Sequence, residues 1–251
     1  MIGCGAGHAH SSHLPALRSF PNVRLEAFCD LDETRLHEAM ERYQVTRGFA
    51  DFREMLEKEE LDAVFAIVAP KRLKEVVIPC FERGLAVSVE KAPGINPEET
   101  RAMLEAAQVN KCLSMVGFDR RFAPIVRKSM ELLENHPAPR RIVAQFYRSY
   151  QSRLQPYDAY IHGLDMMRLL GGDIKDHAIR VHRDESFVDG LDILIEYRNG
   201  DSGNFKAMSR CAIIRESYEI HQPDRSLILD IRGQTLRVLE KDEERIINAE
   251  E

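Results

Sequence analysis

The sequence predicts an α/β protein in two parts, a doubly wound parallel sheet followed by an α+β part with an open, mostly antiparallel sheet. In the first part, short apolar strands alternate with amphipathic helices, a pattern typical of a parallel sheet covered on both faces. In the second part, alternating segments follow one another directly. The turn signal Asn199-Gly200-Asp201 separates two of them, as expected between antiparallel strands.

The first part, residues 1–118, is expected to be a nucleotide-binding domain. One helix start is marked clearly: Asn96 can cap it, Pro97 takes the first helical position and Glu99 follows the cap by three residues. Strands are expected at residues 25–29, 63–68, 85–89 and 113–117, with further helices at 32–43 and 73–83.

The second part, residues 119–251, is expected to bind substrate and to mediate oligomerisation. Its second helix is stopped by Gly171-Gly172. Helices are expected at residues 120–134 and 158–170, and strands at 141–149, 179–181, 191–197, 204–208, 213–220 and 227–231.

Composition excludes several classes of protein. The chain has 251 residues, 44% of them hydrophobic and 30% charged, and a net charge of -6. No broad cationic face for nucleic acid is therefore expected. The longest apolar run, Ala63–Pro70, is far shorter than the ~20 residues of a membrane helix. The five cysteines are scattered without zinc-site spacing, which indicates reduced thiols, a cytoplasmic protein and no metal.

A glycine-rich segment at the start of the chain indicates dinucleotide binding. Gly3, Gly5 and Gly7 would let the backbone approach a pyrophosphate, although His8 stands where the motif usually has its third glycine. Asp30 ends the next strand, where an acid can accept hydrogen bonds from both ribose hydroxyls and repels a 2′-phosphate. This pattern favours NAD over NADP; the alternative is a solvated aspartate at a strand end.

Only Met1 and Ile2 precede the glycine segment, although the first strand of such a domain normally needs about five residues. Either the start of the chain is missing, or the first strand is a stub. A stub would leave the central position of the sheet poorly filled and weaken cofactor binding.

Two segments carry groups suited to catalysis. Glu90-Lys91 follows a strand at the edge that faces the ligand crevice in doubly wound sheets, where a lysine can stabilise a developing negative charge. Asp158, His162 and Asp165 recur at i, i+4 and i+7 and so share one helix stripe, where a carboxylate can orient an imidazole base. The alternatives are a surface ion pair and a solvated helix face.

Taken together, these segments resemble the glucose–fructose oxidoreductase / inositol dehydrogenase (Gfo/Idh/MocA) family of NAD(P)-dependent oxidoreductases. The resemblance runs in register through about the first 175 residues. Its segments are Gly3–Gly5, His13-Leu14-Pro15-Ala16-Leu17, Asp30, Leu61-Asp62-Ala63-Val64, Glu90-Lys91, Val116-Gly117-Phe118-Asp119-Arg120-Arg121-Phe122, Asp158…His162…Asp165 and Leu170-Gly171.

The resemblance implies a Rossmann domain followed by an open antiparallel sheet domain, in proteins that often form homodimers or homotetramers. It implies Lys91, Asp158 and His162 as catalytic residues. Cofactor contacts are expected from Gly3, Gly5, Gly7, His8, Asp30, Pro70, Glu90 and Lys91, and substrate contacts from Arg121, Arg153, Tyr157 and Asp165.

Four features depart from the family pattern. Ala92 stands where the family has proline after Glu-Lys, Lys74 replaces a histidine, and Asp119 replaces an asparagine. These changes concern nicotinamide positioning and substrate choice. The chain also stops at Glu251, before the usual C-terminal segment, which indicates a shortened member or a fragment.

The predicted function is hydride transfer between NAD and a hydroxyl-bearing small molecule, a sugar or polyol. His162 would take the hydroxyl proton, Lys91 would stabilise the alkoxide and Asp158 would orient the base. An NAD-dependent glycosidase of similar fold and a non-catalytic dinucleotide-binding homologue are the alternatives.

Overall fold

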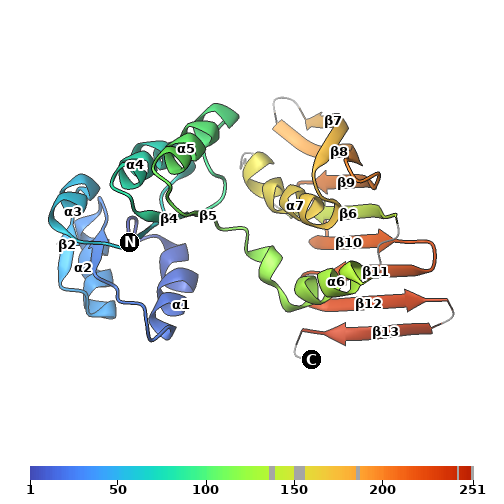
Figure 1. Ribbon diagram of the computed structural model, residues 1–251, viewed down its shortest axis with the longest axis horizontal. Coiled ribbons are helices and arrows are strands. Elements are labelled where there is room, and N and C mark those ends of the chain that lie inside the picture. The colour runs from blue at the N-terminus through green and yellow to red at the C-terminus, as the bar shows by residue number, and fades with distance from the viewer. Residues whose placement is uncertain (136–138, 150–155, 185–186, 242, 250–251) are drawn as a thin grey trace. The chain divides into compact units, whose positions relative to one another are not determined.

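The computed structural model describes the chain except for residues 136–138, 150–155, 185–186, 242 and 250–251, and for 156–159 and 187 it describes the backbone alone. The chain divides into two compact units, Met1–Gly117 and Phe118–Glu251 (Figure 1).

The first unit is built on parallel strands. β1 (Ala27–Cys29) pairs with β2 (Arg47–Phe49), and β3 (Ala63–Ala66) pairs with β4 (Ala86–Val89), which pairs in turn with β5 (Ser114–Val116). β2, with one half-buried residue, was not predicted, because it has too little apolar alternation to be recognised.

Ile2 joins these two sets of strands into one sheet. It bridges Cys29 on one side and Ala66 on the other, both in parallel. Its N–H donates to the Phe65 carbonyl at 2.8 Å, and its own carbonyl accepts from the Ile67 N–H at 2.8 Å. Ile2 is also only 4% exposed. On the β1 side its neighbours make the bonds: the Met1 carbonyl accepts from the Cys29 N–H at 2.9 Å, and the Gly3 N–H donates to the Cys29 carbonyl at 2.8 Å. The first strand is thus a stub, but the expectation that a stub fills the central position poorly is wrong.

Helices cover both faces of this sheet. Phe28 of β1 packs with Leu14 and Leu36 on one face, while its neighbours Ala27 and Cys29 belong to the core on the other. Asn96 accepts from the Glu99 N–H at 2.8 Å, which confirms the predicted cap. The helical segments are η1 (Ala9–His13), α1 (Leu14–Ser19), α2 (Glu33–Tyr43), α3 (Phe52–Lys58), α4 (Pro70–Glu82) and α5 (Pro97–Val109).

The second unit holds, in its described residues, an eight-stranded sheet of order β13-β12-β11-β10-β6-β9-β8-β7. Among the strand pairs that the structure describes in this sheet, only β6 and β9 are parallel, so the predicted mostly antiparallel sheet is confirmed. The strands are β6 (Arg141–Tyr147), β7 (Ile174–Asp184), β8 (Phe187–Tyr197), β9 (Ser202–Met208), β10 (Arg215–His221), β11 (Arg225–Asp230), β12 (Thr235–Glu240) and β13 (Glu243–Asn248).

One face of this sheet packs against α6 (Pro124–Glu134) and α7 (Pro156–Gly171), as Figure 1 shows. The short helix η2 (Asp119–Phe122) precedes α6. Burial alternates along β6, where Ile142, Ala144 and Phe146 point into the core beneath the helices. The alternate residues lie on the opposite face. Among the described residues, no helix is long and apolar enough to cross a membrane.

Candidate cofactor and catalytic sites

Gly3 makes a tight turn between the ends of β1 and β3. Its φ of 79° lies in the left-handed region, and a Cβ there would stand 2.2 Å from the Ile67 carbonyl oxygen. Its N–H donates to the Cys29 carbonyl at 2.8 Å. Only glycine fits both constraints, so this turn holds the backbone against the ends of two central strands.

Asp30 is tied directly to this turn. Its Oδ2 accepts from the Gly5 N–H at 2.7 Å, and its Oδ1 accepts from the Asp32 N–H at 3.0 Å. Each carboxylate oxygen can accept a further hydrogen bond, as a ribose hydroxyl would need. The structure therefore brings together Gly5 and Asp30, two of the predicted cofactor residues.

A cavity of about 370 Å³ opens at the carboxyl ends of β1 and β3. Gly3 and Asp30 line it together with the guanidinium-bearing side chains of Arg35, Arg53 and Arg72. The carboxyl ends of parallel strands are where doubly wound sheets bind dinucleotides. An acid for ribose beside cations for phosphate fits NAD, so these residues suit the cofactor.

The other predicted cofactor residues do not line this cavity. Gly7 is exposed, and a Cβ built on it would meet nothing within 4 Å. His8 is exposed at the start of η1, and Pro70 takes the first turn of α4. These residues can reach the cofactor only from outside the cavity that the structure shows.

Glu90 and Lys91 follow β4, the position that the sequence predicts. His13 Nε2 lies 2.6 Å from Glu90 Oε1. This hydrogen bond, together with the charges of His13 and His8, lowers the pKa of Glu90 against the opposing effect of burial. Glu90 is thus an anion held in place within the first unit, immediately before Lys91.

His162 lies on α7 with 9% of its surface exposed. Its Nε2 is 3.4 Å from Arg120 Nη1, and its Nδ1 is 3.6 Å from Asp119 Oδ1. The ring of Phe118 meets the imidazole edge-on, with centroids 6.1 Å apart. Burial and an edge-on ring restrict the imidazole, while charged groups of opposite sign approach its two nitrogens.

Arg121 and Asp165, both predicted to contact substrate, are bonded to each other. Arg121 Nε donates to Asp165 Oδ2 at 2.6 Å, and its Nη2 donates to Oδ1 at 2.5 Å. The hydrogen bonds to Asp165 raise the pKa of Arg121. This bidentate pair joins η2 to α7, so the groups that would meet a substrate are engaged within the unit.

Three predicted residues fall outside the described side chains. Asp158 and Tyr157 lie in the first turn of α7, where the structure describes the backbone alone, and Arg153 lies outside the described residues. Within the described part of the chain, no group of His, Cys, Asp or Glu is arranged to hold a metal ion.

Glu216, Arg148 and Arg120 are not among the predicted site residues, although they adjoin His162 in a chain of contacts. Arg148 and Glu216 are buried, 8% and 2% exposed, and the Arg148 Nη2 donates to Glu216 Oε2 at 2.5 Å. The sequence carries a signal for both. Arg148 continues the inward phase of β6, and Glu216 shares the inward phase of β10 with Tyr218. Charges at inward positions need partners.

The fold of the first unit and its glycine turn are those of a dinucleotide-binding domain, and the comparisons agree. Residues 1–118 match the model of the Gfo/Idh/MocA oxidoreductase family with its NAD-binding Rossmann fold. Myo-inositol 2-dehydrogenase of Thermotoga maritima is 26% identical over 80% of this chain and 60% of its own length. D-apiose dehydrogenase of Paraburkholderia graminis is 27% identical over 95% of this chain and 66% of its own.

A solved oxidoreductase from Agrobacterium radiobacter, in complex with NAD+, L-tartaric acid and magnesium, has the same fold. Its TM-score is 0.86 at 18% identity, covering 99% of this chain and 78% of that one. Residues 1–118 are therefore similar to the NAD-binding Rossmann domain of the Gfo/Idh/MocA oxidoreductases. The chain spans 60% and 66% of the two curated relatives named above.

Proposed function

We propose that this protein transfers a hydride between NAD(H) and a hydroxyl or carbonyl group of a sugar, polyol or related small molecule. The observation that carries the proposal is the family match over residues 1–118, where Gly3 and Asp30 line one cavity at the ends of β1 and β3. The relatives named for inositol and apiose oxidation support the substrate class.

In the oxidative direction, His162 takes the proton of the substrate hydroxyl. Lys91 stabilises the developing alkoxide, and Asp158 orients the base. NAD, when bound, accepts the hydride. A base placed within reach of the hydroxyl contributes about 10²–10⁴-fold to the rate. The neutral imidazole is the competent form, and the contact from Arg120 Nη1 to Nε2 is compatible with a lone pair on that nitrogen.

The test has two measurements, NAD binding and NADH formation with a panel of polyols, sugars and sugar acids. His162→Ala and Lys91→Ala should each reduce turnover at least about a hundredfold while His162→Ala keeps NAD affinity. Lys128→Ala, an exposed lysine of α6, is the matched control and should change neither.

The outcomes separate the alternatives. NAD binding without turnover across the panel would support a non-catalytic homologue. Release of a free sugar from a glycoside without net NADH would support a glycosidase. Normal turnover of the His162→Ala variant would contradict the role given to that residue.

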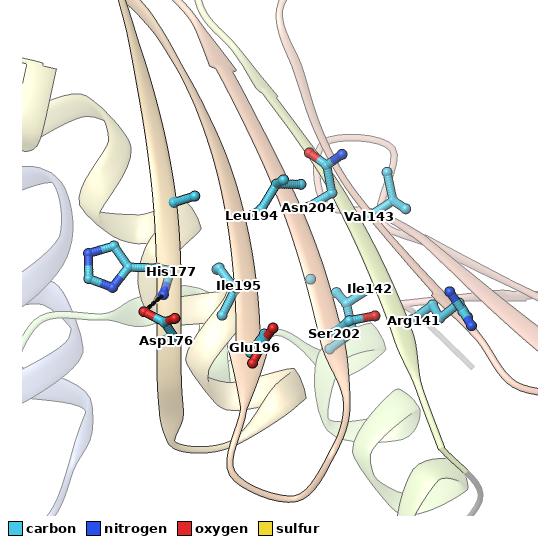
Figure 2. A pocket seen from close by; sticks show the side chains of 12 residues that line it. Arg141, Ile142, Val143, Asp176, His177, Leu194, Ile195, Glu196, Ser202 and Asn204 are labelled. Carbon is cyan, nitrogen blue, oxygen red and sulfur yellow. Dashed lines mark hydrogen bonds between the residues drawn. The ribbon is translucent and has the colours of Figure 1, made fainter.

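We further propose that the protein forms homo-oligomers through the sheet face opposite α6 and α7. Figure 2 shows Leu194, Asn204 and Val143 on this face, and the strand register places them in one row across β8, β9 and β6. They line a hollow of about 470 Å³, and Leu194 is 59% exposed. A large apolar side chain at a hollow favours contact with another protein surface.

Light scattering measures the oligomer directly. Leu194→Glu should reduce the molar mass toward that of one chain, whereas Leu104→Glu, at a similarly exposed position on α5 (51%), should leave it unchanged. A protein that is monomeric at all concentrations would contradict the oligomer.

A cytoplasmic location is also proposed. All five cysteines are free, and three of them are buried, as is usual where thiols stay reduced. Fractionation of cells that express a tagged chain tests this directly, and recovery outside the cytoplasm would contradict it.

A further inference from the structure

Glu216 is a buried carboxylate in the second unit. It lies in β10 at an inward-facing position and is 2% exposed. A buried carboxylate is costly unless cations and hydrogen-bond donors surround it. Each of its two oxygens therefore needs a hydrogen-bond partner, and Glu216 in turn fixes the position of these partners.

Arg148 is the first partner and is itself immobilised. Its Nη2 donates to Glu216 Oε2 at 2.5 Å, while its Nη1 donates to the carbonyls of Tyr147 and Arg215. The guanidinium also lies 3.7 Å from the ring centroid of Phe146. With its donors bound to backbone and to Glu216, Arg148 fixes one end of the carboxylate.

Arg120 is the second partner and links Glu216 to His162. Its Nε donates to Glu216 Oε1 at 3.2 Å. Its Nη1 lies 2.7 Å from Asp119 Oδ1 and 3.4 Å from His162 Nε2. Burial would lower the pKa of Arg120, but the charges of Glu216 and Asp119 raise it, so the guanidinium remains a cation beside the imidazole.

We propose that Glu216 is a positioning residue for His162: by holding the Arg120 guanidinium at Nε2, it fixes the imidazole ring and keeps it in the neutral form that accepts a proton. The inference rests on the proposed function for its catalytic meaning. An N–H that points at Nε2 requires a lone pair there, and a cation at this distance disfavours a second proton on the ring. The 3.4 Å contact is long, so a substrate hydroxyl that binds at Nε2 takes over this lone pair from Arg120.

Carboxylates near His162 act in the opposite sense to Arg120. Asp119 faces Nδ1 from η2 at 3.6 Å and favours the protonated ring, although its side chain is 71% exposed and solvent weakens the attraction. Arg121 and Asp165 neutralise each other through their bidentate pair. The described charged groups that contact the ring are thus Asp119 and Arg120, with Glu216 and Arg148 behind Arg120. Asp158, the proposed orienting carboxylate one turn earlier on α7, lies outside the described side chains, and its charge is the same in every variant compared below.

The experiment follows the imidazole signal of His162 by NMR as a function of pH, in the full chain without cofactor. A His162→Gln variant assigns the signal. Arg120→Gln removes the cation, so the midpoint of the His162 titration should rise by about one pH unit. The acid limb of the kcat/KM profile should move in the same direction.

The direction in which Glu216→Gln shifts the His162 titration midpoint distinguishes two explanations. If Glu216 acts only as a negative charge, its neutralisation leaves Arg120 in place and lowers the midpoint. If it positions Arg120, the guanidinium is released and the midpoint rises toward that of Arg120→Gln. An unchanged or lowered midpoint in Glu216→Gln overturns the proposal. Arg237→Gln, which removes an exposed cation paired with Glu244, is the control and should leave the midpoint unchanged.

Two further points keep the test decisive. If Glu216→Gln fails to fold, as its near-UV circular dichroism would show, Arg120→Gln carries the test, and an unshifted midpoint there overturns the proposal. The titration needs neither cofactor nor turnover. Shifted midpoints in an inactive protein therefore contradict only the proposed function, whereas unshifted midpoints in an active enzyme contradict only the role of Glu216.

Discussion

His13 Nε2 lies 2.6 Å from Glu90 Oε1, so the last residue of η1 is bonded to the residue that directly precedes Lys91. Both side chains are largely shielded, 21% and 19% exposed. Seventy-seven positions separate them in sequence. This contact connects η1, which follows the glycine-rich segment, to the end of β4. Lys91, the predicted catalytic lysine, is the next residue there.

Removing this hydrogen bond should destabilise the first unit. A hydrogen bond to a charged group contributes about 1.5–3 kcal/mol, so His13→Ala should lower the thermal midpoint by several degrees. His37→Ala, an exposed histidine of α2, is the matched control and should have little effect. An unchanged midpoint in His13→Ala would show that the contact contributes nothing to stability.

The same pair predicts a pH dependence. Because the pKa of Glu90 is lowered in the folded protein, its stabilisation is present above the ordinary glutamate pKa and is lost as the pH falls through the folded value. The difference in unfolding free energy between the wild type and Glu90→Gln should therefore shrink in acid. Chemical denaturation at a series of acidic pH values measures it, and a difference that grows in acid would contradict the sign.

The glycines of the first segment should differ sharply in tolerance. Gly3→Ala places a Cβ against the Ile67 carbonyl in a left-handed backbone conformation, and it should destabilise the unit by about 2–4 kcal/mol. Gly7→Ala meets nothing within 4 Å and should change stability by no more than about 0.5 kcal/mol.

Gly7→Ala also tests the predicted cofactor contact, because its fold should be intact. If the backbone of Gly7 must approach the pyrophosphate, NAD affinity should fall severalfold at unchanged thermal stability. Calorimetric titration measures the affinity, and wild-type binding would remove Gly7 from the cofactor residues.

The buried thiols should resist alkylation. Burial raises the pKa of Cys4, Cys29 and Cys80 to about 12 each, so almost none of these groups is thiolate at neutral pH, the form that reacts. Iodoacetamide should label the half-buried Cys112 and Cys211 first, as peptide mass spectrometry will show. Early labelling of Cys80 would contradict this order.

These thiols also set an alkaline limit. Their pKa is higher in the folded than in the unfolded chain, so their contribution is complete below about pH 9 and is lost as the pH rises toward 12. In that pH range, each thiol should lower the unfolding free energy by up to about 1.4 kcal/mol per pH unit. Cys80→Ala should make the unfolding free energy fall less steeply with pH in this range. An unchanged slope would contradict a raised pKa of the Cys80 thiol.

Local signals explain why much of the fold could be predicted. The Asn96 cap of α5 and the Gly171-Gly172 pair at the end of α7 each mark a helix end through local backbone chemistry. The start of α4 was placed at residue 73, whereas the helix begins at Pro70. β12 and β13 were missed. β12 alternates clearly at Leu236 and Val238, but β13 is exposed along most of its length and carries little apolar pattern.

In the candidate site, too, residues marked by a local pattern were predicted, whereas contacts between distant positions were not. Lys91 and His162 were predicted because a strand end and a helix stripe can be read from neighbouring residues. The Arg120–Glu216 contact joins positions 96 apart, and no local pattern specifies such a pairing. Arg121 and Asp165 were predicted to contact substrate, and their spacing gave no indication that they bond to each other across 44 positions.

The Arg121–Asp165 pair offers a choice between holding the fold and binding substrate. Asp165 is 8% exposed in its side chain and Arg121 is 35% exposed, so Arg121→Ala leaves a mostly buried carboxylate without its bidentate partner. We expect a loss of about 2–4 kcal/mol in unfolding free energy. A double-mutant cycle with Asp165→Ala should give a coupling of about 1–3 kcal/mol. A substrate-binding pair would behave differently, since each single variant would raise KM and leave stability nearly unchanged. Denaturation of the four proteins and KM for any accepted polyol distinguish the two. A coupling near zero, together with a raised KM, would restore both residues to the substrate site.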